Sequence, residues 1–172
     1  MEKLSIPNGV NVEVKPVGQV VVTGKGKTYE VQFDNRMNTV VVGNNEVDFK
    51  SIGRESKRKV ACRRSVVAHV KNAFIGIETG FSKKLQVVFS HFPVSIEVKD
   101  GQGIIKNFLG EKVPRLASII GDSKVEVKGQ DITVSGSDKY SVGQTANNFM
   151  AATKIKLKDR RVFQDGIYPV IA

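Results

Sequence analysis

Cysteine, histidine and tryptophan are almost missing from this sequence, which has one cysteine, two histidines and no tryptophan. The single cysteine, Cys62, excludes an internal disulfide framework and a zinc cluster built on cysteines. No apolar run approaches the roughly 18 residues that a membrane-spanning helix needs. Residues 1–7 lack the apolar core of a secretion signal. We therefore expect a cytoplasmic protein that is not bound to a membrane.

Groups suited to catalysis are equally scarce. His69 lies at the edge of the apolar side of an expected helix, and His91 ends an expected strand just before a proline. Residues 24–27, Gly-Lys-Gly-Lys, lack the spacing of a phosphate loop, and the acidic residues show no metal-ligand spacing. We predict no enzymatic activity, no cofactor and no metal site. An enzyme would need a pocket that joins one of these histidines to a carboxylate.

Basic residues are in excess, because 27 Lys and Arg residues are opposed by 17 Asp and Glu residues, a formal charge of +10. Such an excess favours polyanionic partners, nucleic acid first and an anionic membrane surface less often. The hydrophobic content of 40% is that of a folded globular protein. Composition alone thus predicts a folded basic protein and no more.

Two halves of the chain repeat one order of patterns, in which hairpins of alternating apolar and polar residues precede a helical stretch. In the first half we expect a helix near residues 54–74 and strands at residues 10–14, 19–23, 28–33, 39–42 and 46–49. In the second half we expect a helix near residues 141–153 and strands at residues 84–89, 94–99, 103–108, 124–127 and 131–134.

The repeat predicts an α+β fold with two tandem homologous domains, residues 1–79 and 80–172. Each domain is expected to be an antiparallel β-sheet packed on one α-helix, and a basic C-terminal tail follows the second helix. Ser141 and Gln144 have the spacing of a capping box at the start of that helix.

The first expected helix carries basic residues at a spacing of seven, namely Lys57, Arg64 and Lys71. Residues at this spacing form one stripe on a helix. The stripe is either a secondary binding surface or an ordinary solvated face. Arg63 falls among apolar positions, so either its head reaches out to water or the regular helix begins nearer to it.

The C-terminal tail holds a second cluster of basic residues with aromatic residues among them. Residues 154–158 alternate Lys, apolar, Lys, apolar, Lys, so an edge strand there would point its lysines one way. Lysine and arginine neutralise phosphates and flat rings stack on bases, which favours RNA as the partner of an otherwise exposed tail. The members of this cluster are Lys154, Lys156, Lys158, Arg160, Arg161, Phe163, Gly166 and Tyr168.

Several strings go beyond composition. Ser-His-Phe-Pro at residues 90–93 is followed by Asn-Phe-Leu-Gly-Glu-Lys-Val-Pro-Arg at residues 107–115 and by Val-Gly-Gln-Thr-Ala-Asn at residues 142–147. The tail reads Asp-Arg-Arg-Val-Phe-Gln-Asp-Gly-Ile-Tyr at residues 159–168. Over essentially the whole chain the sequence resembles the large-subunit ribosomal protein six family, called protein nine in eukaryotes. These motifs are most similar to those of the archaeal form, although a compact eukaryotic source stays open.

The resemblance implies a structural constituent of the large ribosomal subunit, built from two homologous domains. It also implies binding to large-subunit rRNA near the sarcin–ricin loop and the stalk base, where neighbouring ribosomal proteins are partners and no independent homo-oligomer forms. The family's RNA contacts, carried onto matching positions, include the tail cluster and Lys83, Lys84, His91, Asn107, Phe108, Gly110, Lys112 and Arg115.

Individual roles follow from this implication. Phe108, Phe163 and Tyr168 are expected to stack or wedge against RNA, with a core position as the alternative for Phe108. Glu111 and Asp165 are expected to orient a basic residue or to hold a turn. The first domain departs most from the family pattern, as at Ile75, where a lysine is usual, so we expect it to serve protein neighbours more than RNA.

Two other functions fit the same composition. A free-standing regulatory RNA- or DNA-binding protein would bind its target outside ribosomes. A protein–protein adaptor would use exposed β-edges as docking sites and would keep its partners after nuclease treatment.

Overall fold

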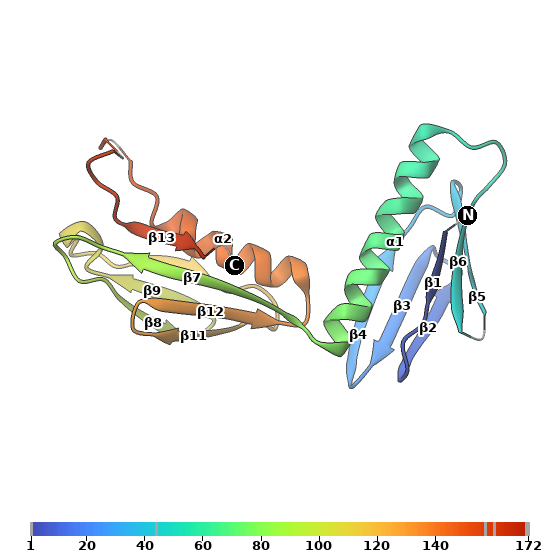
Figure 1. Cartoon of the computed structure of the whole chain (residues 1–172), viewed down its shortest axis with the longest axis horizontal. Coiled ribbons are helices and arrows are strands. Elements are labelled where there is room, and N and C mark those ends of the chain that lie inside the picture. The colour runs from blue at the N-terminus through green and yellow to red at the C-terminus, as the bar shows by residue number, and fades with distance from the viewer. Residues whose placement is uncertain (1, 44, 157, 160, 171–172) are drawn as a thin grey trace. The chain divides into compact units, whose positions relative to one another are not determined.

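The computed structural model describes residues 2–43, 45–156, 158–159 and 161–170. The chain divides into two compact units, residues 1–79 and 80–172 (Figure 1). Each unit combines antiparallel sheets with a long helix, so the α+β fold class predicted from the sequence is confirmed.

Unit 1 pairs its strands in antiparallel sheets of order β2-β3-β4 and β1-β6-β5. Helix α1 (Lys57–Glu78) packs against strands of both sheets (Figure 1). The alternation of the sequence explains the core, because every second residue of β3 and β6 points at the helix, including Val20, Val22, Val47 and Phe49. The strands are β1 (Glu2–Ser5), β2 (Val10–Lys15), β3 (Gln19–Gly24), β4 (Lys27–Gln32), β5 (Asn38–Val42) and β6 (Glu46–Ser51).

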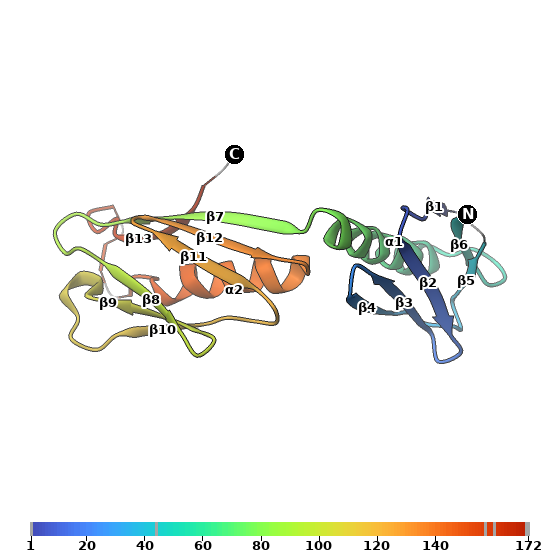
Figure 2. The same ribbon diagram turned by 90° about the horizontal axis from the view of Figure 1, so that it is seen from below.

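Unit 2 pairs its strands in antiparallel sheets of order β11-β12-β7-β13 and β10-β9-β8. Helix α2 (Lys139–Ala152) packs between them, against β7, β10 and β12 (Figure 2). A short 3₁₀ turn, η1 (Phe108–Gly110), follows β9. The strands are β7 (Phe81–Val88), β8 (Ser95–Lys99), β9 (Gln102–Lys106), β10 (Arg115–Ser118), β11 (Lys124–Lys128), β12 (Asp131–Gly136) and β13 (Gly166–Pro169).

Several local expectations were wrong. Helix α2 begins at Lys139 because the side chain of Asp138 accepts hydrogen bonds from the backbone N–H groups of Tyr140 and Ser141, so the N-cap is Asp138 and the Ser141 capping box does not form. The described residues of 154–158 form no strand. The end of the tail, in contrast, does form one: β13 pairs with β7 in the register Gly166↔Val88.

Helix α2 lies close against β9 at Gly103. The ring of Phe149, a fully buried residue, occupies the space into which a Cβ atom at Gly103 would project. A side chain at Gly103 would therefore have to displace a fully buried ring of the unit 2 core.

We expect Gly103→Ala to lower the free energy of unfolding of the protein by about 1–3 kcal/mol, because the core of unit 2 becomes overpacked. Denaturant titration followed by circular dichroism measures the change. Gly143→Ala is the control, since a Cβ atom there meets nothing within 4 Å. On helix α2 this control should be neutral or raise stability by up to about 1 kcal/mol. Equal losses from both variants would contradict the packing of Phe149 on Gly103.

Candidate nucleic-acid interface

Three segments that are far apart in the sequence meet at one end of unit 2. They are the loop after β7 (residues 89–94), the segment that begins with η1 (residues 107–115) and the tail that follows α2 (residues 154–168). Strand pairing brings them together, because Gly166 at the start of β13 lies opposite Val88 at the end of β7. We refer to these three segments as the basic end of unit 2. They contain most of the strings on which the family resemblance was based; the string at residues 142–147 lies on α2 instead.

Hydrogen bonds tie the segments to one another. The backbone N–H of Ser90 donates to Oδ1 of Asp165 at 3.1 Å, which joins the β7 loop to the tail. Nδ2 of Asn107 donates to the carbonyl oxygen of Pro93 at 3.1 Å, which joins the β7 loop to the η1 segment. Asp165 is buried, and its carboxylate ties the tail to the loop after β7. The basic end is therefore a built surface rather than three independent loops.

The η1 turn has an uncommon backbone. Asn107, Leu109 and Gly110 have φ angles of 58°, 52° and 75°, in the left-handed region. Asn and Gly adopt this region readily, whereas Leu does so only under strain. The ring of Phe92 lies 3.3 Å from the position of a Cβ atom at Gly110, so the turn packs against the β7 loop. This backbone buries Phe108 and leaves Lys112 exposed.

Arg115 joins the η1 segment to the start of the tail. Its guanidinium donates to both carboxylate oxygens of Glu111, at 2.8 and 2.6 Å. The same group donates to the carbonyl oxygen of Ala152 at 2.9 Å and to that of Lys154 at 3.3 Å. It also lies 4.5 Å from the centroid of the Phe108 ring, as a cation–π contact requires. Arg115 thus fixes the direction in which the tail leaves α2.

The ion pair shifts the pKa of each partner in the direction that favours its charged form. Hydrogen bonds from Arg115 hold the pKa of Glu111 below its usual range, partly opposed by burial and assisted by the charges of Arg115 and Lys158. The hydrogen bond to Glu111 in turn raises the pKa of the Arg115 guanidinium. Because the pKa of Glu111 is lowered in the folded protein, the contribution of the pair to stability is complete at neutral pH. That contribution is lost as the pH falls below the usual carboxyl range.

At the start of the tail, a buried apolar residue lies between exposed lysines. Ile155 is buried in the core of unit 2, whereas Lys154 and Lys156 on either side are exposed. The hydroxyl of Thr153 accepts a hydrogen bond from the backbone N–H of Ile167 at 3.1 Å and so ties the two ends of the tail together. Nζ of Lys158 lies 4.7 Å from the centroid of the Phe163 ring.

The structure sorts the residues that the sequence predicted for RNA binding. Phe108 is 1% exposed, so its ring belongs to the core and cannot stack on a base; the core alternative is correct. Gly166 is also buried, inside the pairing of β13 with β7. Lys83 and Lys84 are exposed, but they lie within β7 opposite Val134 and Thr133, away from the loop at its end. Arg160 lies outside the described residues. Of the residues predicted for RNA binding, those exposed at the basic end are His91, Asn107, Gly110, Lys112, Lys154, Lys156, Lys158, Arg161, Phe163 and Tyr168.

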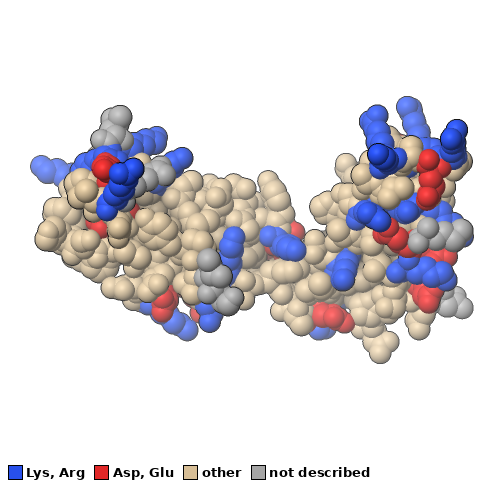
Figure 3. Space-filling model, turned by 45° about the horizontal axis from the view of Figure 1, so that its top comes forward, with Lys and Arg blue, Asp and Glu red and all other residues tan. Residues whose placement is uncertain are grey.

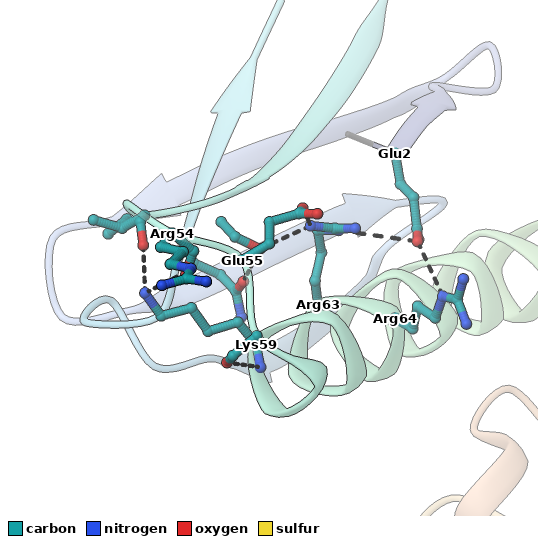
Figure 4. Close-up of polar contacts among 10 residues, drawn as sticks. Glu2, Arg54, Glu55, Lys59, Arg63 and Arg64 are labelled. Atoms are coloured by element: carbon teal, nitrogen blue, oxygen red, sulfur yellow. Dashed lines mark hydrogen bonds and ion pairs between the residues drawn. The ribbon is translucent and has the colours of Figure 1, made fainter.

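Unit 1 carries the secondary basic stripe, with Lys57, Arg64 and Lys71 all exposed on α1. Lys and Arg side chains gather over the start of α1 in unit 1 and over the tail in unit 2 (Figure 3). Arg64 lies 3.4 Å from a carboxylate oxygen of Glu2, which partly neutralises the stripe (Figure 4).

Arg63 fits neither alternative offered by the sequence. The helix begins at Lys57, well before it, and its side chain is 6% exposed instead of reaching water. Its Nη1 donates to Glu55 and to Ser51, both at 2.7 Å, and its Nε lies 3.9 Å from Glu2 (Figure 4). The charge is therefore buried in a pair, and Arg63 anchors the start of α1 to the sheet.

In the described part of the chain, no cluster of three or more His, Cys, Asp or Glu side chains has the arrangement of a metal site. The helices that the structure describes are too short or too polar to span a membrane.

A small α+β protein whose basic, aromatic-bearing end is tied together by hydrogen bonds is of the class that binds RNA through charge and shape. Comparison with known proteins gives the particular family. The family model described as ribosomal protein L6 matches residues 92–166, which include most of the basic end.

Relatives match nearly the whole chain. Large ribosomal subunit protein uL6 of Staphylothermus marinus is 44% identical, over 97% of this chain and 91% of its own length. The proteins of the same name from Methanosarcina mazei and Methanothrix thermoacetophila are 42% and 38% identical, over 97% and 99% of this chain and 94% and 96% of their own lengths. The chain belongs to the ribosomal protein L6 family, in its archaeal-type form.

We expect Arg115→Ala to loosen the tail and to lower the free energy of unfolding by about 1–2 kcal/mol, because carbonyl groups at the end of α2 lose their donor. Hydrogen exchange should accelerate at the amides of Lys154 and Ile167, whereas the amide of Ile132 in β12 should be unchanged. Arg115→Lys keeps the charge but not the paired hydrogen bonds of the guanidinium. Its stability and exchange rates should lie between those of the wild type and those of Arg115→Ala. Wild-type exchange rates in Arg115→Ala would contradict the anchoring role.

Proposed function

We propose that this protein is a structural constituent of the large ribosomal subunit. In this proposal, the basic end of unit 2 binds large-subunit rRNA near the sarcin–ricin loop and the stalk base. The observation that carries the proposal is the arrangement of charge at that end. Carboxylates there are engaged within the protein, and the exposed positive charges are left for an external partner.

The engaged carboxylates can be named. Glu111 pairs with Arg115, and Asp165 accepts a hydrogen bond from the backbone N–H of Ser90. Asp159 accepts one from the backbone N–H of Arg161 at 2.9 Å. Among the described residues, no carboxylate forms an ion pair with the exposed groups Lys112, Lys154, Lys156, Lys158 and Arg161. Such a surface attracts phosphates, and binding releases their counterions.

Rings at the same end add sequence-tolerant contacts. Phe163 and Tyr168 are 39% and 47% exposed, so part of each ring faces solvent beside the basic residues. The hydroxyl of Tyr168 donates to the carbonyl oxygen of Gln164 at 3.1 Å, so this ring is held in place before any partner arrives. Pre-positioned rings stack on unpaired bases at little entropic cost.

Unit 1 has the supporting role in this proposal. Arg63, its main buried charge, forms an ion pair within unit 1, and Arg64 of the basic stripe forms one with Glu2. The other two members of the stripe, Lys57 and Lys71, are separated along α1 by several turns. We propose that unit 1 contacts neighbouring proteins of the large subunit near the stalk base.

The double variant Lys156→Ala with Arg161→Ala should weaken binding to large-subunit rRNA and reduce its dependence on salt. Each lost phosphate contact lowers the slope of log K against log [salt] by somewhat less than one, so we expect a reduction of about 1.5. Filter binding across a series of potassium chloride concentrations measures this slope.

Lys124→Ala with Lys128→Ala is the matched control, because it removes the same charge from β11 at the opposite edge of the sheet from β13. This control should leave the slope nearly unchanged. If both double variants reduce the slope equally, binding depends on net charge alone and the basic end is not the rRNA surface.

A further inference from the structure

A groove of about 420 Å³ lies between helix α2 and the tail of unit 2. This volume is within the range of about 300–1,000 Å³ that is usual for small-molecule sites. One wall is the last two turns of α2 and the other is the tail with β13. Residues of these walls include Asn147, Met150, Ala151, Ile155, Phe163 and Tyr168.

The groove has flat apolar surfaces that are held in place. The Tyr168 ring lies against Gly166, where a Cβ atom would be 3.1 Å from it, and its hydroxyl is bound to Gln164. The Phe163 ring is covered on one face by Lys158. Both rings keep large exposed fractions, so the groove is apolar but not closed by the protein itself. A planar apolar ligand would find stacking surfaces here.

The rim of the groove carries positive charge. Lys154 lines the groove directly, and Lys158 stands over the ring of Phe163. Asp165, the acid among the lining residues, is buried and occupied by the Ser90 N–H. The occupant should therefore be apolar and planar at its centre and negatively charged at its edge. A nucleotide of RNA has this combination, whereas an aromatic side chain of a protein does not.

A polar side chain in the wall of the groove is available to hydrogen-bond the edge of a planar ligand. The side-chain amide of Asn147 is exposed and lines the groove from α2. Within the described residues, no partner hydrogen-bonds this amide. An amide offers a donor and an acceptor side by side, which matches the edge of a nucleobase.

We propose that this groove takes up one unpaired nucleobase of the rRNA bound at the basic end. The base stacks on the rings of Phe163 and Tyr168, Asn147 hydrogen-bonds its edge, and Lys154 and Lys158 contact the flanking phosphates. The inference rests on the proposed function and adds to it a site for a single base, which anchors the RNA in one register.

The test uses large-subunit particles that lack this protein, rebuilt with wild-type protein or with a variant. Dimethyl sulfate reports base edges of the rRNA, and hydroxyl radicals report its backbone. Wild-type protein should protect a backbone footprint and at least one unpaired base. Ala151→Leu fills the groove without changing charge or helix propensity much. It should raise the reactivity of that base about tenfold and leave the backbone footprint in place.

Phe163→Leu removes a stacking ring at an exposed position and should expose the same base, which guards against a folding defect of the first variant. Tyr140→Leu is the control, since Tyr140 is 70% exposed at the other end of α2. It should keep the base protected.

A backbone footprint with no base that responds to either groove variant would overturn this inference but not the proposed function. Benzoylphenylalanine at position 150 that crosslinks to a protein in place of RNA would also overturn it. The tail variant Lys156→Ala with Arg161→Ala tests the proposed function separately. It should weaken the whole footprint, whereas the groove variants should leave the backbone footprint in place.

Discussion

The fork of hydrogen bonds made by Arg115 holds the basic end of unit 2 together. The last carbonyl groups of a helix have no partner within the helix, and Arg115 supplies one to Ala152 at the end of α2. The same guanidinium binds Glu111 in the η1 segment and lies over the ring of Phe108. A single side chain thus couples the helix end, a strained turn and the exit of the tail. The position of Ile155 in the core and the shape of the groove both follow from that exit.

The distribution of charge explains how such a surface works without catalytic groups. Acidic residues of the basic end hold the protein's own backbone and Arg115, so they stabilise the fold instead of pairing with the exposed lysines. At the start of the tail, the exposed Lys154 and Lys156 flank Ile155, which is buried in the core. The lysines are therefore presented from a fixed backbone, and the RNA does not have to order a loose chain before binding. Recognition by charge and shape is the mechanism that this arrangement favours.

Most of the fold could be predicted from the sequence, because it depends on local pattern. Hairpins alternate apolar and polar residues, and both helices show a helical period. Strands β1, β10 and β13 were missed because each is four residues long and pairs with a strand that is distant in the sequence or shows no alternation of its own. The pairing of Arg63 with Glu55 and Glu2 was missed for the same reason, since no local pattern marks a partner that tertiary structure brings near.

The candidate site was predicted as segments rather than as side chains. Family strings identified residues 90–93, 107–115 and 159–168, and the structure brings them together. Those strings did not distinguish residues that hold the surface, such as Phe108 and Arg115, from residues that are presented on it, such as Lys112 and Arg161. Only burial makes that distinction. The groove beside Asn147 could not be predicted at all, because its walls come from a helix and a returning strand.

The central claim is that the basic end of unit 2 is the surface that binds large-subunit rRNA. The most direct measurement is ultraviolet crosslinking in cells, with the crosslinked peptides and nucleotides both identified. Our account predicts peptides from residues 90–93, 107–115 and 154–168, attached to large-subunit rRNA. Crosslinks confined to unit 1 or to the β11–β12 hairpin, or attached to RNA outside the ribosome, would contradict it.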